Sequence, residues 1–150
     1  MRVLLDEDVP EQLVEPLRHL TPGHTIDYVG QTRWAGKKDP DLYRAIRGAG
    51  YDVIVTNDRS QLNDPGLTKE IRRSQVHHVR YSQKHPGLRG LALALGALIA
   101  ALPTLLDELA TAEGQMLVHV HALDPRKKRH TVRDPRVDPP AYWGRRPRRR

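Results

Sequence analysis

The chain has 150 residues, no cysteine and a formal net charge of +7, a length that suits one domain with its own hydrophobic core. Without cysteine there is no disulfide framework and no Cys-based zinc site, so any metal ligands must be Asp, Glu, His or backbone oxygens. The charge is unevenly divided: residues 1–124 contain 14 Lys and Arg against 16 Asp and Glu, and residues 125–150 contain 11 against 2.

These totals predict a mildly acidic domain over residues 1–124 and a basic Pro/Arg-rich tail over residues 125–150. The tail is too polar to bury enough apolar surface to offset its chain entropy, so we expect a disordered or extended arm. The first apolar run, residues 3–5, is too short for the core of a signal peptide. Together with the absence of cysteine, this favours a cytoplasmic protein.

In chain order, residues 3–5 form a short apolar run that predicts a buried strand and stops at three acids. Pro10 suits the first turn of a helix with a leucine stripe that ends at Gly23. Residues 24–29 predict a second strand, and residues 30–38 a loop.

A second helix is expected to begin at Asp39, with Pro40 in its first turn, and it precedes an apolar strand at residues 52–55. A helix at 67–74, a strand at 76–81, a Leu/Ala helix at about 88–110 and a strand at 116–121 complete the pattern. Strands that alternate with helices predict crossover connections, and hence a three-layer α/β/α fold with a mainly parallel sheet. Because the uncharged run 91–106 is shorter than a membrane span and contains Pro103, we expect a buried or homodimer-forming helix and no membrane contact.

Acidic side chains follow two of the predicted strands and begin one helix. They are Asp6, Glu7, Asp8, Asp39, Asp41 and Asp58. Ligands of open parallel sheets bind at the carboxyl ends of the strands, and carboxylates gathered there favour a hard cation such as Mg²⁺ or Mn²⁺. Such an ion can activate a water for attack on a phosphodiester. Asp6 and Asp39 could equally be turn and cap residues, and Asp58 an ordinary loop residue.

Three segments together resemble the PIN-like domains, in particular the small bacterial branch similar to VapC-type toxins. These segments are Leu4–Pro10, Asp39–Leu42 and Val53–Arg59. The resemblance covers about residues 1–82 and depends on the order and spacing of all three. It implies a metal-dependent endoribonuclease, with a cognate antitoxin protein as a partner.

Carried over by position, Asp6, Asp39 and Asp58 resemble the acids that hold Mg²⁺ or Mn²⁺ in that family, with Asp41 as a weaker match for Asp39. Asp8 falls where many relatives have Asn and could bind metal or water, and Thr56 matches a hydroxyl that orients an acid or a phosphate.

One departure from the family pattern concerns the acid expected two residues after Asp58, where this chain has Ser60. Asp64 is the nearest substitute, although Pro65 beside it indicates a loop. The departure leaves open a one-metal site, a slow enzyme or an inactive relative.

The tail is the strongest sign of nucleic-acid binding, because flexible arginine-rich segments bind phosphates without reading sequence. Its predicted RNA contacts are Arg145, Arg146, Arg148 and Arg149, with Tyr142 and Trp143 available for base stacking. A tail that only improves solubility, or one that folds against the acidic body or a partner, remains an alternative. Trp34 could stack on an unpaired base or fill the edge of the core.

His119 and His121 share one face of a predicted strand, but no third metal ligand stands near them in the sequence. The leading hypothesis is therefore a Mg²⁺- or Mn²⁺-dependent endoribonuclease that cleaves single-stranded RNA, as the toxin of a toxin–antitoxin pair. The alternatives are a PIN-like module without activity that binds RNA or a protein, and a phospho-receiver-like signalling domain in which Lys84 would contact the phosphoryl group.

Overall fold

The computed structural model describes residues 1–141 and has an α/β fold built on one sheet of five parallel strands. The strands lie in the order β2-β1-β3-β4-β5. Their bounds are Arg2–Leu5 (β1), Thr25–Tyr28 (β2), Val53–Thr56 (β3), His77–Tyr81 (β4) and Leu117–Val120 (β5). The predicted parallel sheet is confirmed, and within residues 1–141 every strand pair is parallel.

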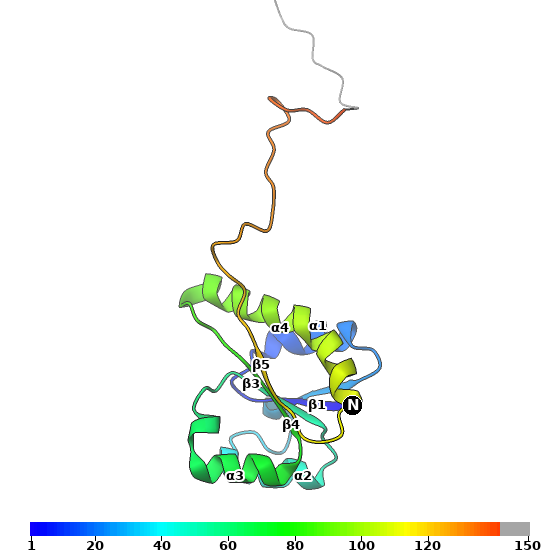
Figure 1. Ribbon diagram of the computed structural model, residues 1–150, viewed down its shortest axis with the longest axis vertical. Helices are drawn as coiled ribbons and strands as arrows, with labels where there is room; N and C mark the ends of the chain where they lie inside the picture. Colours follow the sequence, from blue (N-terminus) through cyan, green and yellow to red (C-terminus); the bar gives the residue numbers. More distant parts are fainter. Residues whose placement is uncertain (142–150) are drawn as a thin grey trace, which may run out of the picture.

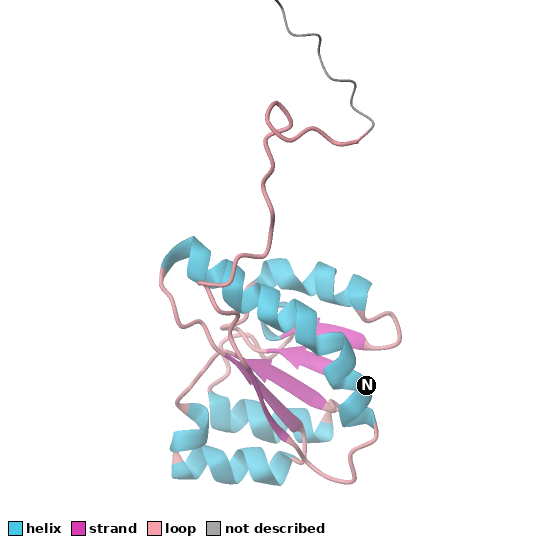
Figure 2. Ribbon diagram, turned by 45° about the horizontal axis from the view of Figure 1, so that its top comes forward, coloured by secondary structure: helices cyan, strands magenta, loops and turns pink. Residues whose placement is uncertain are grey.

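The four α-helices of residues 1–141 cover both faces of the sheet, as Figure 1 shows. They are α1 (Val14–Leu20), α2 (Asp39–Gly48), α3 (Pro65–Ser74) and α4 (Gly87–Ala110). Helices α1 and α4 lie on one face and α2 and α3 on the other, an arrangement compatible with three α/β/α layers (Figures 1 and 2).

The strands have apolar residues on both faces, because each face packs against helices. Val3 and Val55 belong to the cluster under α1 and α4, whereas Leu4 and Ile54 belong to the cluster over α2 and α3. This explains why β1 and β3 read as continuous apolar runs and why each stops abruptly at polar residues.

Helix α4 packs one side on the sheet through fully buried Leu98, Leu102 and Leu106. Among residues 1–141 it is the one helix whose length and hydropathy would suffice to cross a membrane, a test that core helices of soluble proteins also pass. Pro103 lies within this helix, as the sequence indicates.

The first helical segment differs from the prediction at both ends. It begins as a 3-10 turn at Glu11–Leu13, and the α-helix ends at Leu20, ahead of the predicted end at Gly23. Pro22 disfavours a helical conformation at the preceding Thr21. The Thr21 side chain and N–H instead both bond to the Leu17 carbonyl and close the last turn.

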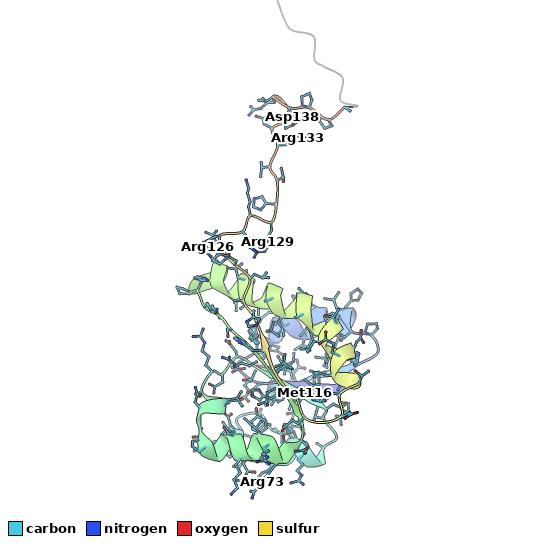
Figure 3. All side chains as sticks on the ribbon, in the orientation of Figure 1. Arg73, Met116, Arg126, Arg129, Arg133 and Asp138 are labelled. Atoms are coloured by element: carbon cyan, nitrogen blue, oxygen red, sulfur yellow. The ribbon has the colours of Figure 1, made fainter. Side chains whose placement is uncertain are left out.

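Residues 121–141 form neither helix nor strand, and in Figure 1 this segment runs away from the sheet. Figure 3 shows the side chains of Arg126, Arg129 and Arg133 along it. Near the domain, residues 125–130 line a shallow cavity with Arg89 and Leu93 of α4.

Candidate functional site

The acids predicted from the sequence gather where β1 and β3 end side by side. Strand β1 pairs with β2 on one side and with β3 on the other, so the chain reverses its direction of travel across the sheet between β1 and β3. This is the topological switch point at which open parallel sheets bind ligands. The Asp6 N–H donates to the Val55 carbonyl at 2.9 Å, which extends the pairing of the strands up to the first acid.

Asp6 is the most buried acid of the group, with 7% of its surface exposed. Its carboxylate accepts hydrogen bonds from the Glu7 N–H at 2.8 Å and from the Gln61 side-chain amide at 3.3 Å. Burial, followed by the charge of Asp8, raises its pKa to about 6, with a smaller contribution from Asp39. A carboxylate in this setting gains free energy from any nearby positive charge.

Asp8 is held against the end of β3. The Thr56 hydroxyl donates to its Oδ2 at 3.0 Å, and the Asn57 N–H lies 3.0 and 3.1 Å from its two oxygens. Burial raises the pKa of Asp8, these hydrogen bonds oppose the rise, and the charges of Asp58 and Asp39 add to it. Thr56 thus orients an acid in this structure.

Asp39 opens α2 and faces Asp6 across a buried amide that the sequence analysis missed. Gln61, 1% exposed, donates from Nε2 to Asp39 Oδ2 at 3.2 Å and to Asp6 Oδ2 at 3.3 Å. One nitrogen therefore lies within hydrogen-bonding distance of both carboxylates. Burial raises the pKa of Asp39, and the charge of Asp58 raises it further against the lowering effect of the Gln61 hydrogen bond.

Two buried side chains contact the oxygen of the Gln61 amide. The Tyr43 hydroxyl donates to Gln61 Oε1 at 2.9 Å, and His78 Nε2 lies 3.1 Å from the same oxygen. Burial lowers the pKa of His78 to about 4, so the ring is neutral at pH 7 and its Nε2 must hold the proton in order to donate. The NH₂ group must then face the two carboxylates. Nothing in the local pattern marks Gln61, because its partners come from α2 and β4.

Asp58 lies in a turn after β3, and its Oδ1 accepts from both the N–H and the hydroxyl of Ser60, each at 2.7 Å. Ser60 therefore fixes the Asp58 side chain. The Asp58 N–H donates to the Thr56 hydroxyl at 3.1 Å, so one threonine links Asp8 and Asp58.

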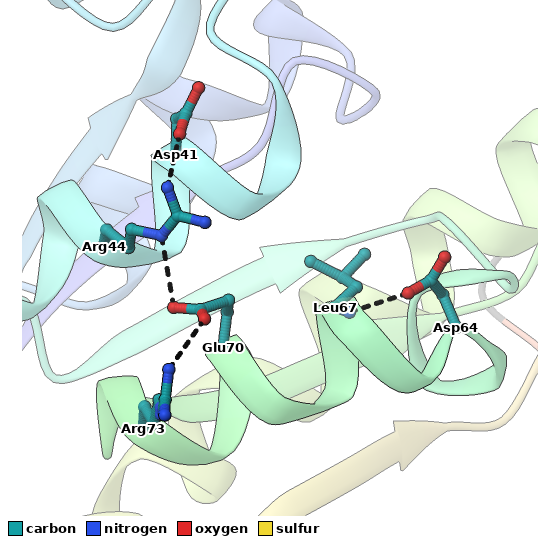
Figure 4. Close-up of polar contacts among 6 residues, drawn as sticks. All are labelled: Asp41, Arg44, Asp64, Leu67, Glu70 and Arg73. Atoms are coloured by element: carbon teal, nitrogen blue, oxygen red, sulfur yellow. Dashed lines mark hydrogen bonds and ion pairs between the residues drawn. The ribbon is translucent and has the colours of Figure 1, made fainter.

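The weaker candidates have structural roles, which Figure 4 shows. Asp41 forms an ion pair with Arg44 at 2.9 Å, and Arg44 also contacts Glu70 of α3. Asp64 caps α3 by accepting from the Leu67 N–H at 2.7 Å. Neither Asp41 nor Asp64 is joined by a hydrogen bond to the other acids of the site.

The site is rich in carboxylates and poor in counter-charges. Within residues 1–141 no ion pair involves Asp6, Asp8, Asp39 or Asp58. This all-oxygen donor set is the chemistry that Mg²⁺ and Mn²⁺ prefer. In the described part of the chain, no three His, Asp or Glu side chains lie close enough together to hold one ion. To hold one ion, these carboxylates would have to draw closer together.

The remaining sequence candidates lie apart from the acids or outside the described residues. Trp34 is 8% exposed and packs edge-on against Tyr51, so it fills the core edge and has no free face for a base. The rings of His119 and His121 are 4.8 Å apart, without a third ligand among residues 1–141. The predicted RNA contacts Arg145, Arg146, Arg148 and Arg149, and the aromatic residues Tyr142 and Trp143, lie outside the described residues.

No protein-family model, curated protein or solved structure matches the chain. The resemblance to PIN-like domains therefore depends on the residues quoted above and on their arrangement alone.

Proposed function

We propose that the chain is a PIN-like, Mg²⁺- or Mn²⁺-dependent endoribonuclease that cleaves single-stranded RNA. The observation that supports this most strongly is the group of unpaired acids at the switch point, two of which share the Gln61 amide. Carboxylates with raised pKa values and no cationic partner, of which Asp6 is also buried, are costly unless a cation binds them. A structural turn or cap would not need such an arrangement.

In this proposal Asp6, Asp39 and Asp58 would bind the metal, and Asp8 would bind it directly or through water. The ion would activate water for attack on a phosphodiester and stabilise the developing negative charge. Thr56 holds Asp8 and the turn of Asp58 in position. Gln61 holds Asp6 and Asp39 near each other before metal arrives.

Cleavage of single-stranded RNA by the full chain tests this function. We expect Mg²⁺- or Mn²⁺-dependent cleavage that is lost in Asp6→Asn and in Asp58→Asn but retained in Asp41→Asn, the matched control whose carboxylate pairs with Arg44. Cleavage that survives in both site variants would contradict the site assignment. Labelling of Asp58 by a small phosphodonor would instead support the receiver-like alternative.

A second candidate is a PIN-like module that binds RNA or a protein partner without cleaving. It is favoured by Ser60, which replaces a possible fourth ligand, and by the absence of a ready three-ligand group among residues 1–141. RNA binding without cleavage in any divalent metal would support this candidate.

The toxin role is a further part of the proposal, and it implies a cognate antitoxin. Growth arrest on expression of the wild-type chain, relieved by Asp6→Asn, would support it. Equal growth with both chains would contradict it.

A further inference from the structure

A second charged surface lies beside the acids, at the ends of β4 and β5. We call it the β4–β5 cationic patch. Its members are Arg59, Arg80, Lys84, His119 and His121. None of them belongs to the acid site.

Strand register relates the members of the patch that lie in or next to β4 and β5. Arg80 of β4 is the partner of His119 in β5, and side chains alternate along a strand, so His121 follows His119 on the same side. The opposite face is apolar, with Val79 and Val120 packed in the cluster under α4. Arg80 and His119 therefore lie on the α2–α3 side of the sheet.

This side of β5 is open to solvent. Leu117 shares it and is 60% exposed, although it is an apolar residue within a strand. His119 is half-buried, and its Nε2 lies 2.9 Å from the Ser82 hydroxyl. A ligand can therefore reach the outer edge of the sheet from this side.

Two contacts bring members of the patch together. The Arg59 guanidinium donates to the Gln83 carbonyl at 3.1 Å, which places it over the segment that contains Lys84. The His121 ring packs on the His119 ring. Burial, and then the positive charges of Arg80, His121, Lys84 and Arg59, lower the pKa of His119.

These cations lack the counter-charges found elsewhere on the domain. Within residues 1–141, Arg59, Arg80 and Lys84 form no ion pair. By contrast, Arg44 and Arg73 share Glu70 on the α2–α3 surface, as Figure 4 shows. Uncompensated positive charges held together attract a polyanion.

The patch adjoins the acid site. Arg59 directly follows Asp58, and the charges of Arg80 and Asp58 both act on His78, whose ring contacts Gln61. A polyanion bound along the patch would thus reach the carboxylates at one end. The neighbouring cluster of acids would not attract an acidic protein surface bound to the patch. An RNA strand bound there would place one phosphodiester at the metal.

We propose that the β4–β5 cationic patch binds the phosphates of a single-stranded RNA segment next to the carboxylate site. This inference rests on the proposed nuclease function, since it supplies the substrate path for that site. Phosphate contacts from these side chains would give affinity and position without reading sequence.

The test measures binding of a short single-stranded RNA to the full chain in EDTA, at several salt concentrations, so that cleavage plays no part. The double variant Arg80→Gln/Lys84→Gln should reduce the slope of log K against log salt by about 1.4, since each lost phosphate contact contributes about 0.7. The matched control is Lys69→Gln/Arg72→Gln, which removes the same charge from the exposed side of α3 and should leave the slope unchanged. Lys84 is exposed, so Lys84→Gln alone should fold normally and lower the slope by about 0.7.

Equal slopes for the wild type, Lys84→Gln and the double variant would overturn the proposal. So would competition by poly-glutamate that matches RNA of the same charge, because it would indicate a protein-binding surface. If the wild-type chain cleaves RNA with a divalent metal but the patch variants bind RNA as the wild type does, the nuclease proposal would hold and the patch proposal would fail. A reduced slope without cleavage in any metal would support the patch and contradict the nuclease.

Discussion

Replacing Asp6 by Asn should stabilise the metal-free protein at pH 8 and destabilise it at pH 4. Folding raises the pKa of this carboxyl from 3.8 to about 6, a shift that corresponds to about 3 kcal/mol. Because the folded pKa is the higher one, stability from Asp6 is fully present below pH 3.8 and is lost as the pH rises through about 6.

Asparagine removes the charge and also one hydrogen bond. Its oxygen can still accept from the Glu7 N–H, but its NH₂ group would meet the Gln61 NH₂ group, a mismatch that costs about 1 kcal/mol. The variant should therefore be more stable by about 2 kcal/mol at pH 8 in EDTA, or roughly 4 to 8 °C in Tm. At pH 4 it should be less stable by at most about 1 kcal/mol, because ionisation of the unfolded carboxyl already offsets part of the mismatch.

Urea unfolding of both proteins between pH 4 and pH 8 measures this crossover. Burial of His78 makes both proteins more stable as the pH rises, which opposes the trend from Asp6. The quantity to follow is therefore the difference in unfolding free energy between the variant and the wild type. A difference in unfolding free energy that does not change with pH would refute the raised pKa. If the variant loses stability relative to the wild type as the pH rises from 4 to 8, the direction of the Asp6 pKa shift would be refuted.

Three further substitutions distinguish residues of the acid site from residues that stabilise the fold. Gln61→Glu should add a carboxylate beside Asp6 and Asp39. The variant should lose at least about 2 kcal/mol of metal-free stability at pH 8 and bind Mn²⁺ more strongly. Weaker Mn²⁺ binding in calorimetry would contradict the placement of Gln61. Asp64→Ala should cost about 1 kcal/mol through loss of the α3 cap while leaving Mn²⁺ affinity unchanged, and a changed affinity would place Asp64 in the site. Leu102→Ala should cost about 2–5 kcal/mol in urea unfolding because Leu102 is fully buried, and a cost under about 1 kcal/mol would contradict the packing of α4.

The sequence predicted the elements well where a local pattern determines them. The apolar runs before Asp6 and before Asn57 stop where β1 and β3 leave the core, which covers both faces of the sheet. The ends of both strands could therefore be predicted from the sequence. The Asp–Pro pair at 39–40 marked the start of α2, and the Leu/Ala run marked α4. The end of α1 was misplaced because Pro22 acts one residue earlier than the expected glycine.

The site was only partly predictable, since its geometry depends on contacts between distant elements. Asp6, Asp8, Asp39 and Asp58 were visible as acids at the ends of strands or at the start of a helix. The strand order that brings β1 beside β3 is not encoded in any local spacing. Gln61 was missed for the same reason, because an isolated glutamine at the start of a short 3-10 helix gains its role only when Tyr43 and His78 approach it.

Mn²⁺ binding by the full chain at pH 7.5, followed by electron paramagnetic resonance or calorimetry, tests most directly whether the acids form a metal site. The account predicts saturable binding that Asp6→Asn and Asp39→Asn each abolish or greatly weaken and that Asp41→Asn leaves unchanged. Binding that is absent from the wild-type chain, or equal in all four proteins, would contradict a metal site at the ends of β1 and β3.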